Sequence, residues 1–399
     1  MNVFIKQTCK LSGVLVGLLL LVLGSAAVAE DDQPVLPGLT KIKTVASTVP
    51  ANGDVNPYGV AQVKRTIGNL RAGHILISNF NNSGNFQGTG TTIVQVAPDG
   101  SVGLFATLDA AHLPDSCPGG VGLTTALVVL KQGWVIVGSL PTANQGTTFT
   151  GPGCLIVLDS LGQPRETFYG SLINGPWDMT AFDGDHEANL FVTNVLNGTV
   201  AAGGAVVRHG TVTRLNLKVS AGAPPELQSI TVIGSGFPEH TDPAALVIGP
   251  TGVGLRASCA GDRDDCAEDG GHNEDGEHND SSLLYVADTV SNRVAVIDRA
   301  LTRTTSAGIG RTLSSGGSLN GPLGLVVTPS GTVLTVNSSD GFITEISPHG
   351  KQVAKMQLDN TPVPGSLPGA GTLFGLTFDP AAGVYFVDDG SNTLNLLHH

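Results

Sequence analysis

Four short runs of apolar and β-branched residues, separated by three tight turns of polar residues, glycine and proline, predict four strands between residues 321 and 358. The segments 324–328, 332–337, 342–346 and 352–358 are rich in β-branched and other apolar residues. The intervening turns read Pro-Ser-Gly, Ser-Asp-Gly and His-Gly-Lys, which are typical turn sequences. One four-stranded sheet cannot bury both of its faces. The pattern therefore predicts one unit of a repeat fold that packs against neighbours of the same kind.

Two sequence phrases recur along the chain in a fixed order, at a spacing of roughly 50 to 60 residues. The first phrase is NPYGV, GPWDM, GPLGL or TLFGL, and the second is an apolar strand that ends in Asn or Asp. These strand ends are Asn79, Asn194, Asp288, Asn337 and Asp389, with Gly138 as the one departure. We expect the short polar side chains to bond to backbone amides of the following turns rather than to form a ring of metal ligands.

Six copies of this unit fit the chain. They start near Tyr58, Gly120, Trp177, Ala244, Leu323 and Phe374. The pattern predicts an all-β protein, a six-bladed β-propeller of four-stranded antiparallel blades, in one domain over residues 40–399. Because the last copy ends before its fourth strand, we expect a spare strand at 40–49 to complete that blade and close the ring. Residues 30–39 would be a short linker, and 258–282 an acidic loop insertion in the fourth blade.

The repeats resemble NHL repeats, and residues 282–300 (SLLYVADTVSNRVAVIDRA) match the second and third strands of such a repeat best. The resemblance covers most of the chain after residue 40 and implies a six-bladed propeller. The chain is also distantly similar to gluconolactonase-like and strictosidine-synthase-like propellers. Because these families include binding scaffolds, lyases and hydrolases, the resemblance does not select one function.

The first 29 residues have the pattern of a secretory signal. Lys6 and Lys10 precede an apolar run over 11–23, and small residues end at Ala29. Cleavage after Ala29 would make the mature protein secreted or periplasmic. The alternative is an uncleaved membrane anchor over 11–29, a stretch at the short end for a span.

Export makes disulfides plausible, and four cysteines lie after the signal. Cys117 and Cys154 are expected on one face of the second blade, and Cys259 and Cys266 share the acidic insertion. We therefore predict the pairs Cys117–Cys154 and Cys259–Cys266. Free thiols are the alternative.

Charge narrows the class of partner. The formal net charge is −13 and no cluster of Lys and Arg is present, which argues against a nucleic-acid partner. A carbohydrate, a small molecule or another protein fits better, on a monomer with no membrane association after signal cleavage. The acidic insertion could chelate Ca²⁺, and His272 or His278 there could favour a transition metal, but a solvated mobile loop is the stronger expectation.

The face of the ring at which the chain enters each blade, here called the entry face, is the expected functional face. Long loops at 81–92, 140–153 and 197–210 lie there in three neighbouring blades and could form one wall. The residues that open the innermost strands should rim the channel and bind a ligand, with packing between blades as the competing role. They are Tyr58, Trp177, Leu323 and Phe374.

Asp178 replaces the glycine found at Gly59, Gly324 and Gly375 of the same phrase. A carboxylate at this position would point toward the channel, so Asp178 is the first candidate for a polar ligand contact.

The sequence also contains candidate metal ligands, on weaker signals than that for Asp178. His112, His209 and His240 fall in loops of the entry face and could hold Zn²⁺ or another divalent cation. The segment NGPWD (174–178) is similar to the Glu-Gly-Pro-x-Trp phrase of the gluconolactonase-like family. Asn174 stands where that family places its glutamate ligand, and the Trp lies one residue early.

Three functions remain open. The leading one is an exported, non-enzymatic binding or scaffold protein whose entry face takes a carbohydrate, small-molecule or protein ligand. The alternatives are a metal-dependent lactonase or related hydrolase, and an NHL-type lyase that needs a three-histidine site. No catalytic Ser-His-Asp order or phosphate-binding loop is evident in the sequence.

Overall fold

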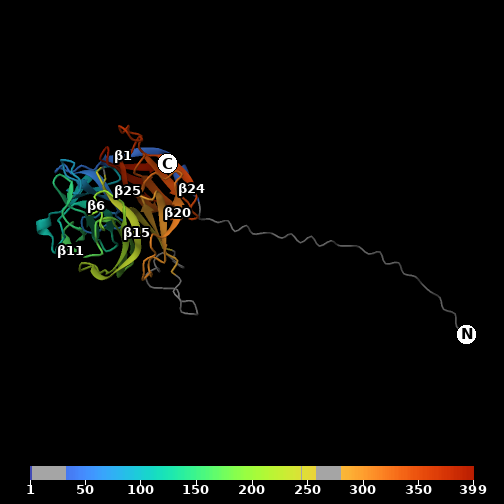
Figure 1. Cartoon of the computed structure of the whole chain (residues 1–399), viewed down its shortest axis with the longest axis horizontal. Helices are drawn as coiled ribbons and strands as arrows, with labels where there is room; N and C mark the ends of the chain where they lie inside the picture. The colour runs from blue at the N-terminus through green and yellow to red at the C-terminus, as the bar shows by residue number, and fades with distance from the viewer. Residues whose placement is uncertain (2–32, 244, 258–279) are drawn as a thin grey trace. The chain divides into compact units, whose positions relative to one another are not determined.

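The chain folds into six β-sheets that form the blades of a β-propeller (Figure 1). This computed structural model describes all residues except 2–32, 244 and 258–279. The innermost strand of each sheet contacts the innermost strands of its two neighbours. In this way β2, β6, β12, β17, β21 and β25 follow one another around a closed ring. The predicted fold class is confirmed.

Each of the first two blades has four antiparallel strands, in chain order from the channel outward. The first blade comprises β2 (Val55–Gln62), β3 (Ile75–Asn81), β4 (Thr92–Val96) and β5 (Val102–Thr107). The second comprises β6 (Leu123–Val129), β7 (Val135–Ser139), β10 (Cys154–Leu158) and β11 (Pro164–Phe168). Between β7 and β10 the chain forms a small hairpin of β8 (Thr142–Ala143) and β9 (Thr148–Phe149), and a short 3-10 helix, η2 (Ala110–His112), precedes β6.

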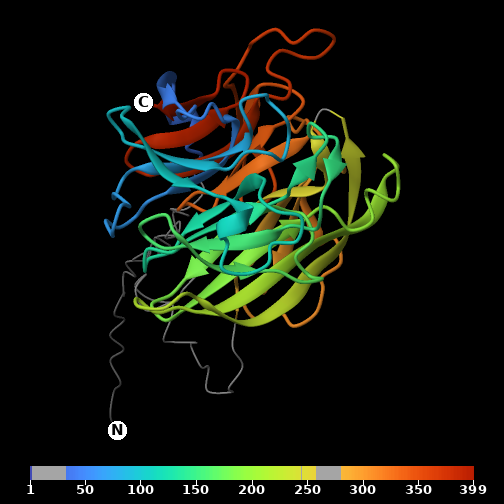
Figure 2. The same cartoon turned by 90° about the vertical axis from the view of Figure 1, so that its left-hand side faces the viewer.

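The third blade has five strands, and its long β14–β15 pair is visible in yellow-green in Figure 2. Its members are β12 (Pro176–Asp183), β13 (Glu187–Asn194), β14 (Val207–Lys218), β15 (Glu226–Asp242) and β16 (Leu246–Ile248). The sequence placed the start of the fourth blade near Ala244, and this was wrong. The apolar run there pairs back onto β15 as β16, and the fourth blade opens at Pro250, where the Gly-Pro pair of the first phrase recurs.

The fourth and fifth blades return to four strands. The fourth comprises β17 (Pro250–Arg256), β18 (Leu283–Asp288), β19 (Arg293–Asp298) and β20 (Arg311–Ser315). The fifth comprises β21 (Pro322–Val327), β22 (Val333–Asn337), β23 (Phe342–Ile346) and β24 (Gln352–Gln357), close to the four strands predicted for it. The acidic insertion joins β17 to β18, and most of it lies outside the described residues.

The sixth blade joins the two ends of the chain, as predicted. It comprises β25 (Leu373–Asp379), β26 (Gly383–Asp388), β27 (Thr393–His398) and, outermost, β1 (Lys41–Ser47). Figure 2 shows the blue β1 among the red C-terminal strands. The pairing runs antiparallel from Lys41 opposite His398 to Ser47 opposite Thr393.

A second contact, just before β1, strengthens this closure. Leu36 in the 3-10 helix η1 (Leu36–Gly38) and Leu39 pack into the apolar core between the fifth and sixth blades. The backbone amides of Val35 and Leu36 both donate to the buried carboxylate of Glu345, each at 2.9 Å. We call residues 33–47 the closing segment.

Apolar cores lie between neighbouring blades, because each sheet buries both of its faces. The approach is close at the channel. A Cβ atom on Gly375 would lie 2.1 Å from the carbonyl oxygen of Tyr58, and one on Gly324 would lie 1.9 Å from that of Phe374. Only glycine fits at these two positions of the first phrase.

The predicted disulfide of the second blade is present. Cys117, before β6, is bonded to Cys154 at the start of β10, with a Cα–Cα distance of 5.3 Å. Cys259 and Cys266 lie outside the described residues. In the part of the chain that the structure describes, no helix has the length and apolar character needed to cross a membrane.

Candidate functional site

The four predicted rim residues do meet at the centre of the ring, but as a packed cluster. Tyr58 stacks on Phe374 with ring centroids 4.1 Å apart, and the ring centroid of Trp177 lies 5.9 Å from that of Tyr58. With Leu323 they belong to one apolar core, and none is more than 7% exposed. We call Tyr58, Trp177, Leu323 and Phe374 the channel plug. The plug fills the entry-face end of the channel, so the open aromatic platform expected there is not present.

Strand register explains why these residues converge. In each blade the innermost strand has a bulge after its first residues, so the next residue turns toward the channel axis. The second and fourth blades place Thr125 and Thr251 at the matching position. The second blade has one additional residue in its bulge, between Leu123 and Leu127.

The long loops of the entry face partly join, as predicted. The amide of Thr142 donates to the carbonyl oxygen of Gly88 at 3.0 Å, which links the loops of the first and second blades. Phe149 from the small hairpin packs against the core that contains the channel plug. The loop of the second blade therefore adds to the apolar core that contains the plug.

Beyond the plug, the channel opens into a cavity of about 390 Å³. Its walls are the later residues of all six innermost strands, so it lies toward the face that carries the turns between the first and second strands of each blade. We call this the turn face. The wall includes one apolar residue from each blade at matching register: Val60, Leu127, Met179, Val253, Leu325 and Leu376.

Asp178 lies at the inner end of this cavity, next to the plug, and it is buried. Its Oδ1 accepts from the amide of Met179 at 2.8 Å, and its Oδ2 accepts from the amide of Val253 in the next blade at 3.1 Å. Burial nevertheless dominates and raises the pKa of Asp178 to about 7, since these two hydrogen bonds offset only part of the desolvation. A carboxyl group with this pKa can exchange a proton near neutral pH.

A second polar group, the buried hydroxyl of Thr125, lines the inner end of the cavity without a partner among the described residues. Thr125 lies on β6, the innermost strand next to β12, which carries Asp178, and both residues line the cavity. Because a buried hydroxyl is costly to leave unpaired, the pair marks a place for a polar ligand atom or a water.

Charged side chains surround the mouth of the cavity at the turn face. Lys64 and Arg65 follow β2, Lys131 follows β6, and Asp183 ends β12. The amide of Lys131 donates to Asp183 Oδ2, while Asp183 Oδ1 is buried without a partner among the described residues. Desolvation raises the pKa of Asp183, although Lys131 and Arg65 act in the opposite sense.

The histidine candidates do not form a metal site. His112 Nδ1 lies 2.9 Å from Asp109 Oδ2, His209 contacts the carbonyl oxygen of Asn197, and His240 contacts that of Thr241. Within the described ranges, no group of three or more His, Cys, Asp or Glu side chains could hold a metal ion.

Asn174, which stands in the place of the lactonase family's glutamate ligand, also makes hydrogen bonds within the protein. Its side-chain amide donates to Asn197 Oδ1 at 2.9 Å and to the carbonyl oxygen of Leu196 at 3.3 Å. The residues present therefore do not fit the metal that the family resemblance implies.

The recurring Asn and Asp side chains at the ends of the second strands have structural roles. Asn194 accepts from the amide of Asn174, and Asn337 accepts from that of Asn320. Register shows that Ser139 takes this place in the second blade, and that Asp388 rather than Asp389 takes it in the sixth.

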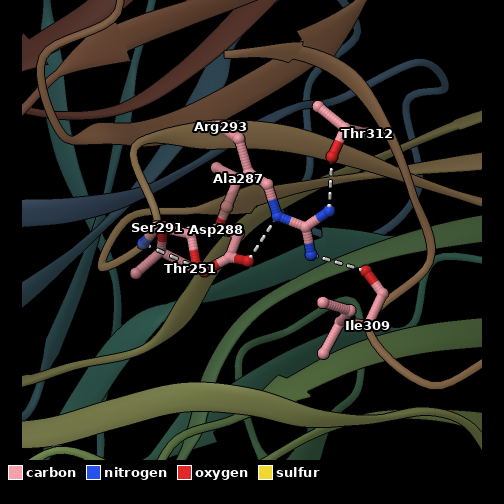
Figure 3. A network of polar contacts seen from close by, with 7 residues as sticks. All are labelled: Thr251, Ala287, Asp288, Ser291, Arg293, Ile309 and Thr312. Carbon is pink, nitrogen blue, oxygen red and sulfur yellow. Dashed lines mark hydrogen bonds and ion pairs between the residues drawn. The ribbon is translucent and has the colours of Figure 1, made fainter. Parts of the chain in front are cut away.

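The fourth-blade member of this series forms a buried ion pair (Figure 3). Asp288 Oδ2 accepts from Arg293 Nε at 2.8 Å, and its Oδ1 accepts from the amide of Ser291 at 3.3 Å. The guanidinium of Arg293 also donates to Thr312 Oγ1 and to the carbonyl oxygen of Ile309. This network ties three strands and a loop of one blade together without lining the cavity.

Sequence reasoning identified Asp178 but missed Thr125 and the cations of the mouth. Basic residues shortly after an innermost strand, at 64–65 and at 131, were the available signal. Thr125 gave no signal, because the additional residue in its bulge breaks the first phrase in that blade.

We expect the stability of the protein to fall as the pH rises from 5 to 8. Burial raises the pKa of Asp178 and Asp389 to about 7 and that of Glu239 to about 8. The folded state therefore binds these protons more tightly than the unfolded chain. The stabilisation from these protonated carboxyls is complete below pH ~4. It is lost as the pH rises through their pKa values in the folded state, and Asp178 alone accounts for on the order of 4 kcal/mol.

Thermal unfolding at pH 5, 6, 7 and 8 measures this effect. We expect a fall in Tm of at least about 5 °C over this range. The Asp178→Asn variant should show a shallower slope. A Tm that is constant or rises between pH 5 and 8 would contradict the burial of ionisable carboxyls described above.

Comparison with known proteins supports the fold. No family model and no curated protein matches the sequence. A gluconolactonase from Xanthomonas campestris superposes with a TM-score of 0.51 at 13% identity, over 92% of this chain and 93% of its own. A luciferin-regenerating enzyme reaches 0.50 at 11% identity, over 90% and 95%. Virginiamycin B lyase from Staphylococcus aureus reaches 0.44 at 12% identity, over 90% and 99%.

These structural neighbours are gluconolactonase-like and lyase propellers of six blades. At identities of 11 and 13%, the likeness to the luciferin-regenerating enzyme and to the gluconolactonase shows the shared fold and does not carry a substrate from one protein to another. The NHL resemblance remains a prediction from the repeats.

Proposed function

We propose that the protein is a small-molecule hydrolase that cleaves an ester or lactone in the channel cavity, with Asp178 as its general base. One observation carries the proposal: a carboxyl group with a pKa of about 7 lies at the inner end of a cavity of about 390 Å³. Strongly raised pKa values in concave sites are typical of catalytic groups. The reaction class agrees with the lactonase alternative drawn from the sequence, but it uses no resident metal.

The chemistry required of these residues is limited. The Asp178 carboxylate would take a proton from a water molecule as the water oxygen bonds to the acyl carbon. The ester C–O bond then breaks, and the same proton passes to the leaving oxygen. The unpaired hydroxyl of Thr125 at the same end could donate to the acyl oxygen as charge develops on it.

A non-catalytic binding protein is the second candidate. It is favoured by the position of Asp178, whose two oxygens already accept backbone amides of two neighbouring blades. In that case Asp178 joins the blades, and the cavity only binds its ligand. Under either candidate we propose export, which the pattern of residues 1–29 and the Cys117–Cys154 disulfide favour.

Asp178→Asn separates the two candidates. With para-nitrophenyl esters and simple lactones as substrates, we expect kcat/KM to fall by about 10²-fold or more, and the limb of the pH profile near 7 to disappear. Asp389→Asn is the matched control, because it removes a half-buried carboxyl that also has a pKa of about 7 but does not line the cavity. Its turnover should equal that of the wild type.

Turnover retained in Asp178→Asn would exclude Asp178 as the base. Absence of turnover in the wild type, together with ligand-induced stabilisation, would favour the binding protein.

A further inference from the structure

Among the described residues that line the mouth of the cavity, positive charges outnumber negative ones. Lys64, Arg65 and Lys131 line it from two adjacent blades, and Asp183 is the acidic residue among the lining residues at that end. The ion pairs of the described residues include neither Arg65 nor Lys131. Lys64 Nζ donates to the side-chain oxygen of Gln62. The side-chain amide of Gln62 in turn donates to Asp379, which does not line the cavity. Two cations are therefore available to an anionic ligand.

The cavity between this mouth and Asp178 has an apolar wall. Each of the six blades contributes an apolar residue directly after the position of Asp178, such as Leu127, Val253 and Leu376. Asp183 lies five residues beyond Asp178 on β12. At a rise of about 3.3 Å per residue, the mouth and the inner end are about 16 Å apart along the strand, and the long Lys and Arg side chains shorten this span.

One small anion cannot reach both ends of such a site. An elongated molecule with an anionic head and an apolar body matches the cations, the wall and the polar inner end in that order. Like charge disfavours the opposite orientation, since an anion at the inner end would face the Asp178 carboxylate.

We propose that the site takes an amphiphilic monoanion, an ester or lactone whose carboxylate tail binds Arg65 and Lys131 at the mouth while its acyl group reaches Asp178. This proposal rests on the proposed function for its reacting group, whereas the ligand class follows from the cavity alone. The step remains the hydrolysis given above, with water as the only co-reactant.

Binding tests the ligand class without turnover. Octanoate carries a carboxylate on an apolar chain, and octanamide is its neutral counterpart. In isothermal titration calorimetry we expect octanoate to bind at least ten times more tightly than octanamide. In the Arg65→Gln/Lys131→Gln double variant this preference should vanish, because both substitutions remove cations and leave the wall intact.

Two further variants serve as controls for the effect of charge on the preference for octanoate. Lys43→Gln removes an exposed cation on β1, at the outer edge of the sixth blade, and should leave the preference unchanged. Asp183→Asn removes the negative charge at the mouth and should increase it. Equal affinity for octanoate and octanamide, or a preference that survives the double variant, would overturn the proposal.

Turnover gives the second readout and separates the two proposals. The substrates are two para-nitrophenyl esters, the octanoate ester and the suberate monoester, which differ in the carboxylate tail of the suberate. We expect the suberate monoester to be cleaved with at least tenfold higher kcat/KM. Hydrolysis of both esters at equal rates would overturn the ligand class and leave the hydrolase standing. Selective octanoate binding without cleavage of either ester would overturn the hydrolase and leave the ligand class standing.

Discussion

A chain that begins at Thr48, and so lacks the closing segment (33–47), should lose at least about 5 kcal/mol of stability. Removal of Leu36 and Leu39 exposes their pockets between the fifth and sixth blades, at about 2 kcal/mol each. The carboxylate of the fully buried Glu345 loses two of the three hydrogen bonds that it accepts from described residues, and β27 loses its outer partner. Since whole proteins are stable by only about 5 to 15 kcal/mol, this loss removes a large part of the total stability.

A chain that begins at Gln33 is the control, because it keeps the entire closing segment. Urea unfolding followed by the fluorescence of Trp134 and Trp177 compares the two. We also expect the shorter chain to scatter light after refolding, since β27 then presents an unpaired edge to other molecules. Equal midpoints for the two chains would show that the ring does not depend on its N-terminal strand.

The fold was largely predictable because blade strands are short, rich in apolar and β-branched residues, and followed by turn residues. The fifth blade shows this best, since every one of its strands was located to within two residues. Ring closure followed from counting, because the last copy lacked a strand and a spare one lay at the other end. The error at Ala244 arose because β16 is as apolar as an innermost strand, and only its pairing with β15 distinguishes it.

The site was less predictable, because its residues meet only through the ring. The first phrase correctly placed Tyr58, Trp177, Leu323 and Phe374 on the channel axis. Whether they stay open or pack together depends on distances across the ring, and three of them are large enough to fill it. The position of the cavity follows from this packing, since a blocked entry face leaves the space on the turn face.

The surroundings of the polar residues on and after the innermost strands could not be predicted from the sequence alone either. Asp178 was identified because it replaces glycine in a repeated phrase. Its raised pKa depends on burial by neighbouring strands, and the amide that partly compensates for this burial belongs to Val253 in another blade. Arg65 and Lys131 are far apart in the sequence and share one cavity only because β2 and β6 are neighbours.

Arg293→Met should destabilise the protein by about 4 kcal/mol. Among the described residues, the substitution leaves the carboxylate of the fully buried Asp288 with one hydrogen bond of 3.3 Å, from the amide of Ser291, and no countercharge. Removal of one partner from a buried ion pair typically costs about 3 to 5 kcal/mol, because the other charge stays desolvated. Thr312 Oγ1 and the carbonyl oxygen of Ile309 also lose their donor. Urea denaturation at pH 7 measures the change in free energy.

Lys218→Met is the matched control, because it breaks an ion pair of the same chemical type at the surface. Lys218 Nζ lies 3.7 Å from Glu226 Oε2, with the two side chains 64% and 61% exposed, so its loss should cost less than about 1 kcal/mol. The Asp288→Asn/Arg293→Met double variant should recover part of the stability that Arg293→Met loses, since no unpaired charge then remains buried. Equal destabilisation by Arg293→Met and Lys218→Met would mean that the fourth blade does not depend on the buried ion pair.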